Sequence, residues 1–282
     1  CKFGTKQYWD AMYSKTSSSA VVDVNNGDDL PSDKYSWYCG WTELQPFWDM
    51  LITPLITDGN DNMHSVKVLI SGIGNDITPI QMYDDGWTNM IAFDYSEDGV
   101  CRAKELFGPD RLLLSSQQQG KDCDNGNDND DDDDERSTVD ATTTSSCNGG
   151  GGTAKLLTAD CRSLPIPSGH IDAILDKGTL DAIYITGPEV FRDSVKELTR
   201  VTSCDGGMIV CISAVIPQEV MLDAFGNNSY SSSRSDNGEE CCWEIVHDGG
   251  LAFADGGDAS IDLGANLYSF VLKTKEKGGE EK

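Results

Sequence analysis

The strongest constraint on the fold is an alternation of short apolar runs with longer helical patterns, which repeats along most of the chain. The apolar runs predict strands at residues 66–71, 90–94, 155–158, 171–175, 208–213, 241–247 and 267–274. Helical patterns predict helices at residues 76–83, 96–107, 180–184 and 189–201. Strand–helix–strand units with right-handed crossovers specify a mostly parallel sheet with helices on both faces. We therefore expect an α/β fold with a seven-stranded sheet.

One segment interrupts this pattern. Between residues 115 and 153 the composition changes to Gln, Gly, Asn, Asp, Ser and Thr, with ten acidic and two basic side chains. Such a segment cannot bury enough apolar surface to fold, so we predict a disordered acidic insertion. Weak calcium chelation by its Asp run is an alternative to a solvated loop. We expect a single domain over residues 1–282, a length that supports one large core.

The chain is strongly acidic, with 48 Asp and Glu against 21 Lys and Arg and a formal charge of −27. This charge repels phosphate backbones and anionic lipids, so we expect no nucleic-acid or membrane partner and favour a basic protein substrate. Solubility alone is the alternative explanation. No apolar run approaches the roughly 20 residues that span a bilayer, and no signal segment opens the chain. We expect a soluble, cytoplasmic monomer, although a start at Cys1 leaves a preceding targeting segment open.

The cysteines and histidines do not form a recognisable metal site. None of the ten cysteines forms a C-x-x-C motif, and five stand singly in apolar or strand-like surroundings: Cys39, Cys101, Cys161, Cys204 and Cys211. We therefore expect reduced, buried thiols, which are typical of intracellular proteins. The three histidines lack zinc-ligand spacing, so no metal is predicted.

Ligands of parallel α/β sheets bind at the carboxyl ends of the strands. At the end of the first predicted strand, Gly72 and Gly74 form a G-x-G turn, where missing side chains let a ligand approach the backbone. Asp94 follows Gly74 by 20 residues and ends the next strand, where a carboxylate meets ribose hydroxyls in nucleotide-binding sheets. A tight turn with a strand-capping Asp is the alternative.

The type of nucleotide follows from the residues around this turn. A dinucleotide fingerprint would have a third glycine where this chain has Ile77. S-adenosylmethionine has no phosphate and needs room at the first turn for its amino acid part. Asp160 and Cys161, at the end of the third strand, are suited to the adenine. The pattern therefore favours a methyltransferase over a nicotinamide dehydrogenase, for which no His or Tyr-x-x-x-Lys acid/base set is present either.

Six motifs then occur in an order typical of one family: FGTKQYWDAMY (3–13), KYSWYCGW (34–41), VLISGIGNDITPIQMYDDGW (68–87), IAFDYS (91–96), ADCRSLPIPSGHIDAILDKGTLDAI (159–183) and RVTSCDGGMIVCIS (200–213). Together they resemble the class I, seven-β-strand methyltransferases related to the elongation factor 1-alpha lysine methyltransferases. The resemblance covers residues 3–114 and 154–274, and the D-K-G-T-L-D-A string is its most specific part. It implies a Rossmann-like class I methyltransferase fold.

The resemblance also implies an S-adenosylmethionine site, with an amino-terminal lid at residues 1–45. The positions expected to contact the cofactor are Trp9, Tyr13 and Tyr35 of the lid, Gly72 and Gly74, Asp94, Tyr95, Asp160, Cys161 and Lys177. An aromatic lid has a physical purpose, because a sulfonium cation is attracted to aromatic faces. Simple packing of the aromatic residues, and an exposed ion pair between Lys177 and Asp176 or Asp181, are the alternatives.

Two positions depart from the family pattern. Gly-Ile-Gly replaces the commoner Gly-Cys-Gly, and Asp76 stands where Ser usually follows Asn75. The second change is expected to alter the amino acid pocket slightly.

Methyl transfer to an amine is an in-line displacement that needs positioning and exclusion of water rather than a strong base. We predict transfer to a lysine amine of a protein, with Asp176 at the acceptor side, and the resemblance implies elongation factor 1-alpha as the first candidate substrate. Asp181 is expected to be a helix cap or an ion-pair partner. A small-molecule methyltransferase and a non-catalytic adenosyl-binding interaction module are the alternatives.

Overall fold

The computed structural model describes residues 2–14, 36–55, 63–113, 152–227, 233–234, 238, 240–255 and 259–275 of the 282-residue chain. Nearly all of the predicted acidic insertion, residues 115–153, lies outside the described residues. The described part of the predicted lid consists of residues 2–14 and 36–45.

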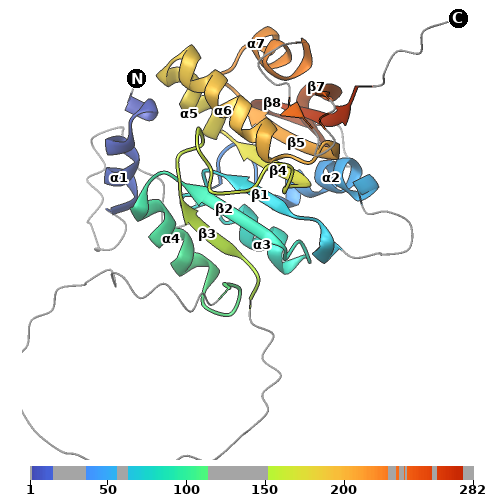
Figure 1. The fold of residues 1–282 in the computed structure, drawn as a ribbon. Helices are drawn as coiled ribbons and strands as arrows, with labels where there is room; N and C mark the ends of the chain where they lie inside the picture. The colour runs from blue at the N-terminus through green and yellow to red at the C-terminus, as the bar shows by residue number, and fades with distance from the viewer. Residues whose placement is uncertain are drawn as a thin grey trace, which may run out of the picture.

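A single mixed sheet organises the molecule (Figure 1). Its strands are β1 (Val68–Ser71), β2 (Met90–Asp94), β3 (Lys155–Thr158), β4 (Ala173–Lys177), β5 (Asp205–Ser213), β6 (Ser233–Arg234), β7 (Glu240–Asp255) and β8 (Ala259–Thr274). They lie in the order β3-β2-β1-β4-β5-β8-β7-β6. The first five in this order are mutually parallel, and β8 pairs antiparallel with β5 and β7. The predicted fold class is confirmed: seven main strands form the sheet, and the two-residue β6 extends its edge.

Helices cover both faces of this sheet. They are α1 (Lys6–Ser14), α2 (Trp41–Ile52), α3 (Thr78–Asp84), α4 (Glu97–Phe107), α5 (Thr179–Thr186), α6 (Pro188–Val201) and α7 (Gln218–Leu222), with single turns η1 (Lys2–Gly4), η3 (Thr53–Leu55), η4 (Met63–Ser65) and η5 (Asp223–Asn227). Alternation along β1 sends Val68 and Ile70 into a core with α2, α3 and α4, and Leu69 into a second core with α5, α6 and α7. A strand buried on both faces explains the continuous apolar run.

The predicted elements occur close to their expected places, with instructive differences. The helix expected after Ser96 is α4, and the Ser96 hydroxyl accepts the Gly99 amide as its cap. The helices α1, α2 and α7 were not predicted. Lys177 belongs to β4 instead of following it, because the strand continues to pair with Ile212 of β5. The charged residues are accommodated inside the strand by buried partners.

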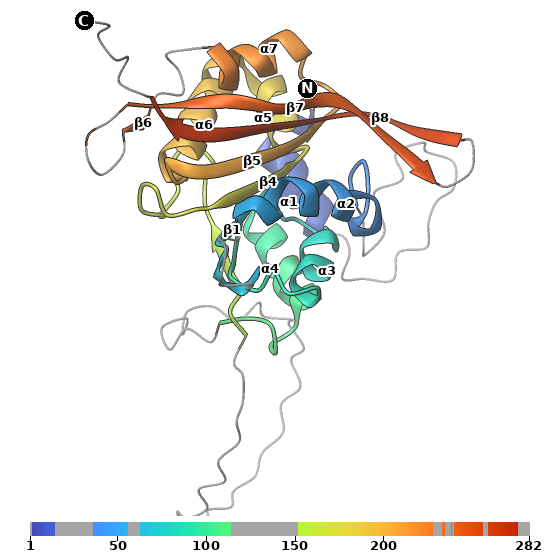
Figure 2. The ribbon, with the colours of Figure 1, turned by 90° about the vertical axis from the view of Figure 1, so that its right-hand side faces the viewer.

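The two long strands β7 and β8 form a hairpin that extends beyond the rest of the sheet (Figure 2). Pairing of β8 with β5 ends at Ser213 and Asn266, whereas pairing with β7 continues to Asp255 and Ala259. These strands are therefore longer than their apolar patterns predicted.

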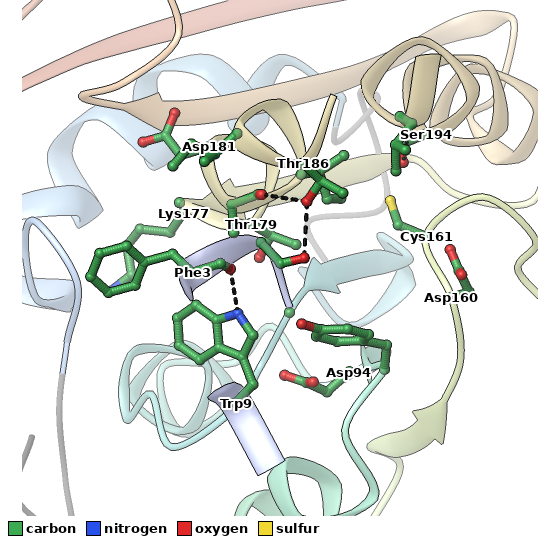
Figure 3. Close-up of a pocket in the computed structure, with 18 of the residues that line it drawn as sticks. Phe3, Trp9, Asp94, Asp160, Cys161, Lys177, Thr179, Asp181, Thr186 and Ser194 are labelled. Carbon is green, nitrogen blue, oxygen red and sulfur yellow. Dashed lines mark hydrogen bonds between the residues drawn. The ribbon is translucent and has the colours of Figure 1, made fainter. Parts of the chain in front are cut away.

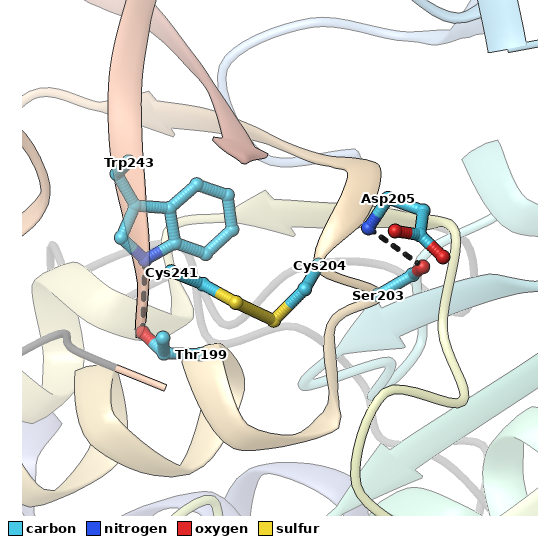
Figure 4. Close-up of a disulfide and its surroundings, with 6 residues drawn as sticks. All are labelled: Thr199, Ser203, Cys204, Asp205, Cys241 and Trp243. Carbon is cyan, nitrogen blue, oxygen red and sulfur yellow. Dashed lines mark hydrogen bonds between the residues drawn. A yellow bond between two sulfur atoms is a disulfide. The ribbon is translucent and has the colours of Figure 1, made fainter. Parts of the chain in front are cut away.

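The prediction of reduced thiols was wrong for one pair of cysteines. Cys204 and Cys241 form a disulfide that joins the start of β5 to the start of β7 (Figure 4). The two residues are 37 positions apart, and only the pairing order of the sheet brings them together. Disulfides are rare in intracellular proteins, so the cysteines no longer favour an intracellular location. Among the residues with assigned structure, Cys39, Cys161, Cys211 and Cys242 are free thiols.

Within the described ranges, no helix is long and apolar enough to cross a membrane. No group of three or more His, Cys, Asp or Glu side chains in that same part of the chain is arranged to hold a metal ion.

Candidate functional site

A pocket of about 340 Å³ opens at the carboxyl ends of β1, β2, β3 and β4 (Figure 3). Eight of the predicted cofactor contacts line it: Trp9, Tyr13, Gly72, Asp94, Tyr95, Asp160, Cys161 and Lys177. The parallel register gathers these residues, because strands that run the same way end at the same edge. Tyr35 lies outside the described residues.

The glycine turn after β1 is tightly enclosed. Gly72 and Gly74 have φ angles of +62° and +45°, a region that favours glycine. A Cβ atom on Gly72 would collide with the Thr179 side chain, and one on Gly74 would collide with the Tyr13 hydroxyl. The turn therefore needs glycine both for its conformation and for the close approach of its neighbours.

Asp94 lines the pocket and is only 4% exposed. Its Oδ2 accepts the Gly74 amide at 3.0 Å and its Oδ1 accepts the Ser96 amide at 2.9 Å. Burial raises the pKa of this carboxyl to about 6, and the two amides oppose the shift. Each ionised oxygen accepts one backbone amide and keeps a lone pair for a further donor, such as a ribose hydroxyl.

The lid covers the pocket through α1 and the turn before it. Trp9 stacks on Tyr13 with ring centroids 6.0 Å apart and meets the edge of Trp37, also at 6.0 Å. The Trp9 indole donates to the carbonyl of Phe3 at 2.7 Å. Tyr13 is 8% exposed, and burial raises the pKa of its hydroxyl. The aromatic residues therefore pack together and also form part of the pocket lining.

The lid is fixed on both sides of the pocket. On the α4 side, the Ser96 hydroxyl donates to Asp10 at 2.6 Å. On the α5 side, the Thr186 hydroxyl donates to the carbonyl of Gly4 at 3.0 Å. In this closed arrangement the lid bridges the helices that follow β2 and β4.

Asp160 and Cys161 form the wall at the end of β3. Asp160 is paired with Arg162, whose Nη2 lies 2.5 Å from Oδ2, and this contact lowers the pKa of the carboxyl. Cys161 is 5% exposed, and burial raises the pKa of its thiol. A protonated thiol here packs as a small apolar group rather than acting as a nucleophile.

The ammonium group of Lys177 is surrounded by protein acceptors. It lies 2.7 Å from Asp76 Oδ2 and donates to the Cys39 carbonyl and the Thr78 hydroxyl, both at 2.8 Å. The Lys177 side chain is 4% exposed and that of Asp76 is 12% exposed. All three N–H donors thus have protein partners. Lys177 lines the pocket and also holds residues 39, 76 and 78 together; its direct contact with the cofactor stays a prediction.

Asp176 does not reach the pocket lining. It is 0% exposed, its Oδ1 accepts the Leu180 amide at 3.1 Å, and burial raises its pKa to about 7. The expected role of Asp176 at the acceptor side stays a prediction, and Asp176 is not among the residues that line the pocket.

The acidic side chain that does line this end of the pocket is Asp181. It accepts hydrogen bonds from the Tyr38 hydroxyl at 2.6 Å, from the Ala214 amide at 3.0 Å and from the Ser213 hydroxyl. Its hydrogen-bond partners come from two other segments, at Tyr38 and at residues 213–214. These contacts are neither a helix cap nor an ion pair, the two roles expected for Asp181. Sequence reasoning missed this role and that of Tyr38, although both residues belong to quoted motifs.

Sequence comparison finds relatives of low identity among the methyltransferases. A scan against protein-family models finds no match. The eEF1A lysine and N-terminal methyltransferase of Mus musculus is 24% identical over 216 residues, which are 75% of this chain and 22% of that protein. The protein of the same name from Homo sapiens is 23% identical over 216 residues, again 75% and 22% of the two chains. This chain therefore spans about a fifth of the length of the curated relatives it matches.

The chain resembles the class I methyltransferases. The resemblance inferred from the six motifs is thereby confirmed. Similar solved structures include the Burkholderia thailandensis 1,6-didemethyltoxoflavin-N1-methyltransferase, with a TM-score of 0.43, 9% identity and coverage of 83% of this chain and 80% of that one. A TehB-like SAM-dependent methyltransferase from Corynebacterium glutamicum has a TM-score of 0.42, 13% identity and coverage of 83% and 94%. The strand order and register of this chain's own sheet show the α/β fold.

Proposed function

We propose that this protein is an S-adenosylmethionine-dependent methyltransferase that modifies a lysine amine of a protein. The observation that carries the proposal is the shared pocket of the glycine turn, the buried Asp94 carboxylate and the aromatic lid. The named relatives methylate eEF1A according to their names, so eEF1A is the first candidate substrate. The formal charge of −27 favours a basic protein surface as the partner.

The residues present fit the cofactor. Gly72 lines the pocket at the turn where the amino acid part would bind, and Asp94 retains acceptor capacity for ribose hydroxyls. Asp160 and Cys161 would border the adenine, and Trp9 and the other lid aromatics would contact the sulfonium region. The bound cofactor supplies an activated methyl group.

The protein's part in the reaction is to position the acceptor and exclude water. The bound cofactor would supply a methyl group to the acceptor nitrogen, and sulfur would keep the electron pair of the carbon–sulfur bond. A proton leaves the nitrogen for solvent. A closed lid that holds the reacting groups in line and removes water lowers the barrier without a strong base. The cytoplasmic, monomeric state expected from the sequence remains a prediction.

Two experiments test the proposal. Calorimetric titration of the folded protein with S-adenosylhomocysteine should show binding, and Asp94→Ala should abolish it; an intact protein that does not bind would refute the cofactor. Incubation with radiolabelled S-adenosylmethionine and purified eEF1A, followed by peptide mass spectrometry, should identify a methylated lysine. Label found only in small molecules of a cell extract would favour the small-molecule alternative. Cofactor binding without transfer to any component would favour the interaction module.

A further inference from the structure

The five residues 36–40 form an irregular segment that is held against the pocket by contacts at both ends. At one end the Ser36 hydroxyl donates to Asp76 at 2.9 Å. At the other, the Cys39 carbonyl accepts the Lys177 ammonium, and the Gly40 amide donates to Glu43 at 2.9 Å. The segment is therefore fixed by side chains from β4, from the turn before α3 and from α2.

Tyr38 lies in the middle of this segment in an unusual conformation. Its φ of +64° makes it the one residue other than glycine with positive φ among those that the structure describes. Such a conformation costs of order 1 kcal/mol or more and persists where the surroundings impose it. Its ring lies against Gly178, where an added Cβ atom would be 3.1 Å from Tyr38 Cε2. Strain and close packing together fix the direction of the hydroxyl.

The Tyr38 hydroxyl donates to Asp181 at 2.6 Å, and Tyr38 and Asp181 both line the pocket. Burial and the Asp181 hydrogen bond raise the pKa of Tyr38, so the phenol is neutral and donates a hydrogen bond to Asp181. A neutral phenol oxygen that donates its own proton still accepts a hydrogen bond. The pocket lining also includes Val215, which is 44% exposed and offers apolar contact.

The order of the strands places this hydroxyl at the acceptor end of the pocket. From β3 to β5 the edge presents Asp160, Asp94, Gly72 and then the turn after β4. Tyr38 contacts that last turn at Gly178, and its partner Asp181 is bonded to the turn after β5. The positions expected for the adenine, the ribose and the amino acid part lie at the ends of β3, β2 and β1, on the side of this turn away from β5.

We propose that the Tyr38 hydroxyl, held by Asp181, accepts an N–H from the acceptor amine and orients its nitrogen in the reaction. The proposal rests on the proposed methyltransferase function. Tyr38 would contact the substrate, whereas Asp181 is a positioning residue. The site would select amines on an apolar stem over acceptors that have no N–H group, since the latter offer no donor to the remaining lone pair of the Tyr38 oxygen.

The test uses two adenosyl analogues and needs no identified protein substrate. In one, a four-carbon chain ending in a primary amine replaces the transferable methyl group; in the other, the chain ends in a methyl group. Calorimetry should show that the wild-type protein binds the amine about tenfold more tightly than the alkyl analogue, the value of one hydrogen bond. Tyr38→Phe should remove this preference and leave S-adenosylhomocysteine affinity unchanged.

A matched control is Tyr83→Phe, which removes a tyrosine hydroxyl that contacts Thr153 away from the pocket and should retain the preference. Asp181→Asn gives a second measure. This change weakens the hydrogen bond that orients Tyr38, so the variant should lose part of its preference for the amine analogue. A wild-type protein without preference for the amine, or a preference that survives in Tyr38→Phe, would overturn the inference. Failure of S-adenosylhomocysteine to bind at all would instead overturn the proposed function.

Discussion

Lys177 is the side chain whose replacement tests the structure most directly. The change to Met keeps the length and apolar stem of the side chain but removes the ammonium group. Three acceptors lose their donor, and one of them, the Asp76 carboxylate, is left as an uncompensated charge at 12% exposure. Removing one partner of a buried ion pair costs about 3–5 kcal/mol.

The remaining contacts of Asp76 put the expected loss near the lower limit of that range. Its Oδ1 still accepts the Ser36 hydroxyl and the Thr78 amide, both at 2.9 Å, so the carboxylate keeps part of its solvation. We expect Lys177→Met to lower the free energy of unfolding by about 3 kcal/mol. The double variant Lys177→Met, Asp76→Asn has no charge left at this pair. Its loss in free energy of unfolding should therefore be about 2 kcal/mol smaller than the sum of the losses in the two single variants.

Urea denaturation followed by circular dichroism measures all four corners of this cycle. A matched control is Lys273→Met, which breaks an ion pair with Glu244 whose side chains are 51% and 54% exposed. That change should cost less than about 1 kcal/mol. Additive single changes, or a Lys177→Met variant as stable as the Lys273→Met control, would refute the buried ion pair.

Three further results are expected. Since burial raises the pKa of Asp94 to about 6, S-adenosylhomocysteine affinity should fall as pH decreases through that value, and Asp94→Asn should remove both the affinity and the pH dependence in calorimetry. Gly74→Ala should lower the melting temperature more than Gly108→Ala, because both have positive φ but only Gly74 lies against the lid. Reduction of the Cys204–Cys241 disulfide, or Cys204→Ser, should cost about 4 kcal/mol in urea denaturation for a 37-residue separation, with cofactor affinity unchanged; equal stability with and without reductant would contradict the bond.

Local patterns determined much of the fold. The strands β1 and β2 are apolar runs bounded by Gly72 and Asp94, and such runs report burial on both faces of a sheet directly. Ser96 followed by two acids marked the start of α4. Because parallel strands end at one edge of a sheet, the same patterns predicted that the glycine turn and Asp94 lie close together.

Contacts between distant segments could not be predicted from such patterns. The pairing of Cys204 with Cys241 depends on the position of β8 between β5 and β7, which the strand patterns do not reveal. The helix α1 has a mixed sequence, and it packs on Gly74 and Gly99 through Tyr13. Asp181 resembled an ordinary first-turn acid because its partners come from segments 143 and 32 residues away.

The departure at Asp76 and the surroundings of Lys177 are physically connected. An ammonium group has three donors, and a serine at position 76 would provide a neutral acceptor where this chain has a carboxylate. With Asp76 the ion pair neutralises the charge of Lys177 inside the protein, so its electrostatic attraction for a carboxylate ligand is weakened. The same pair fixes the segment that bears Tyr38, through Ser36 on Asp76 and the Cys39 carbonyl on Lys177. We therefore propose that Lys177 contributes to the pocket chiefly by ordering the segment that bears Tyr38.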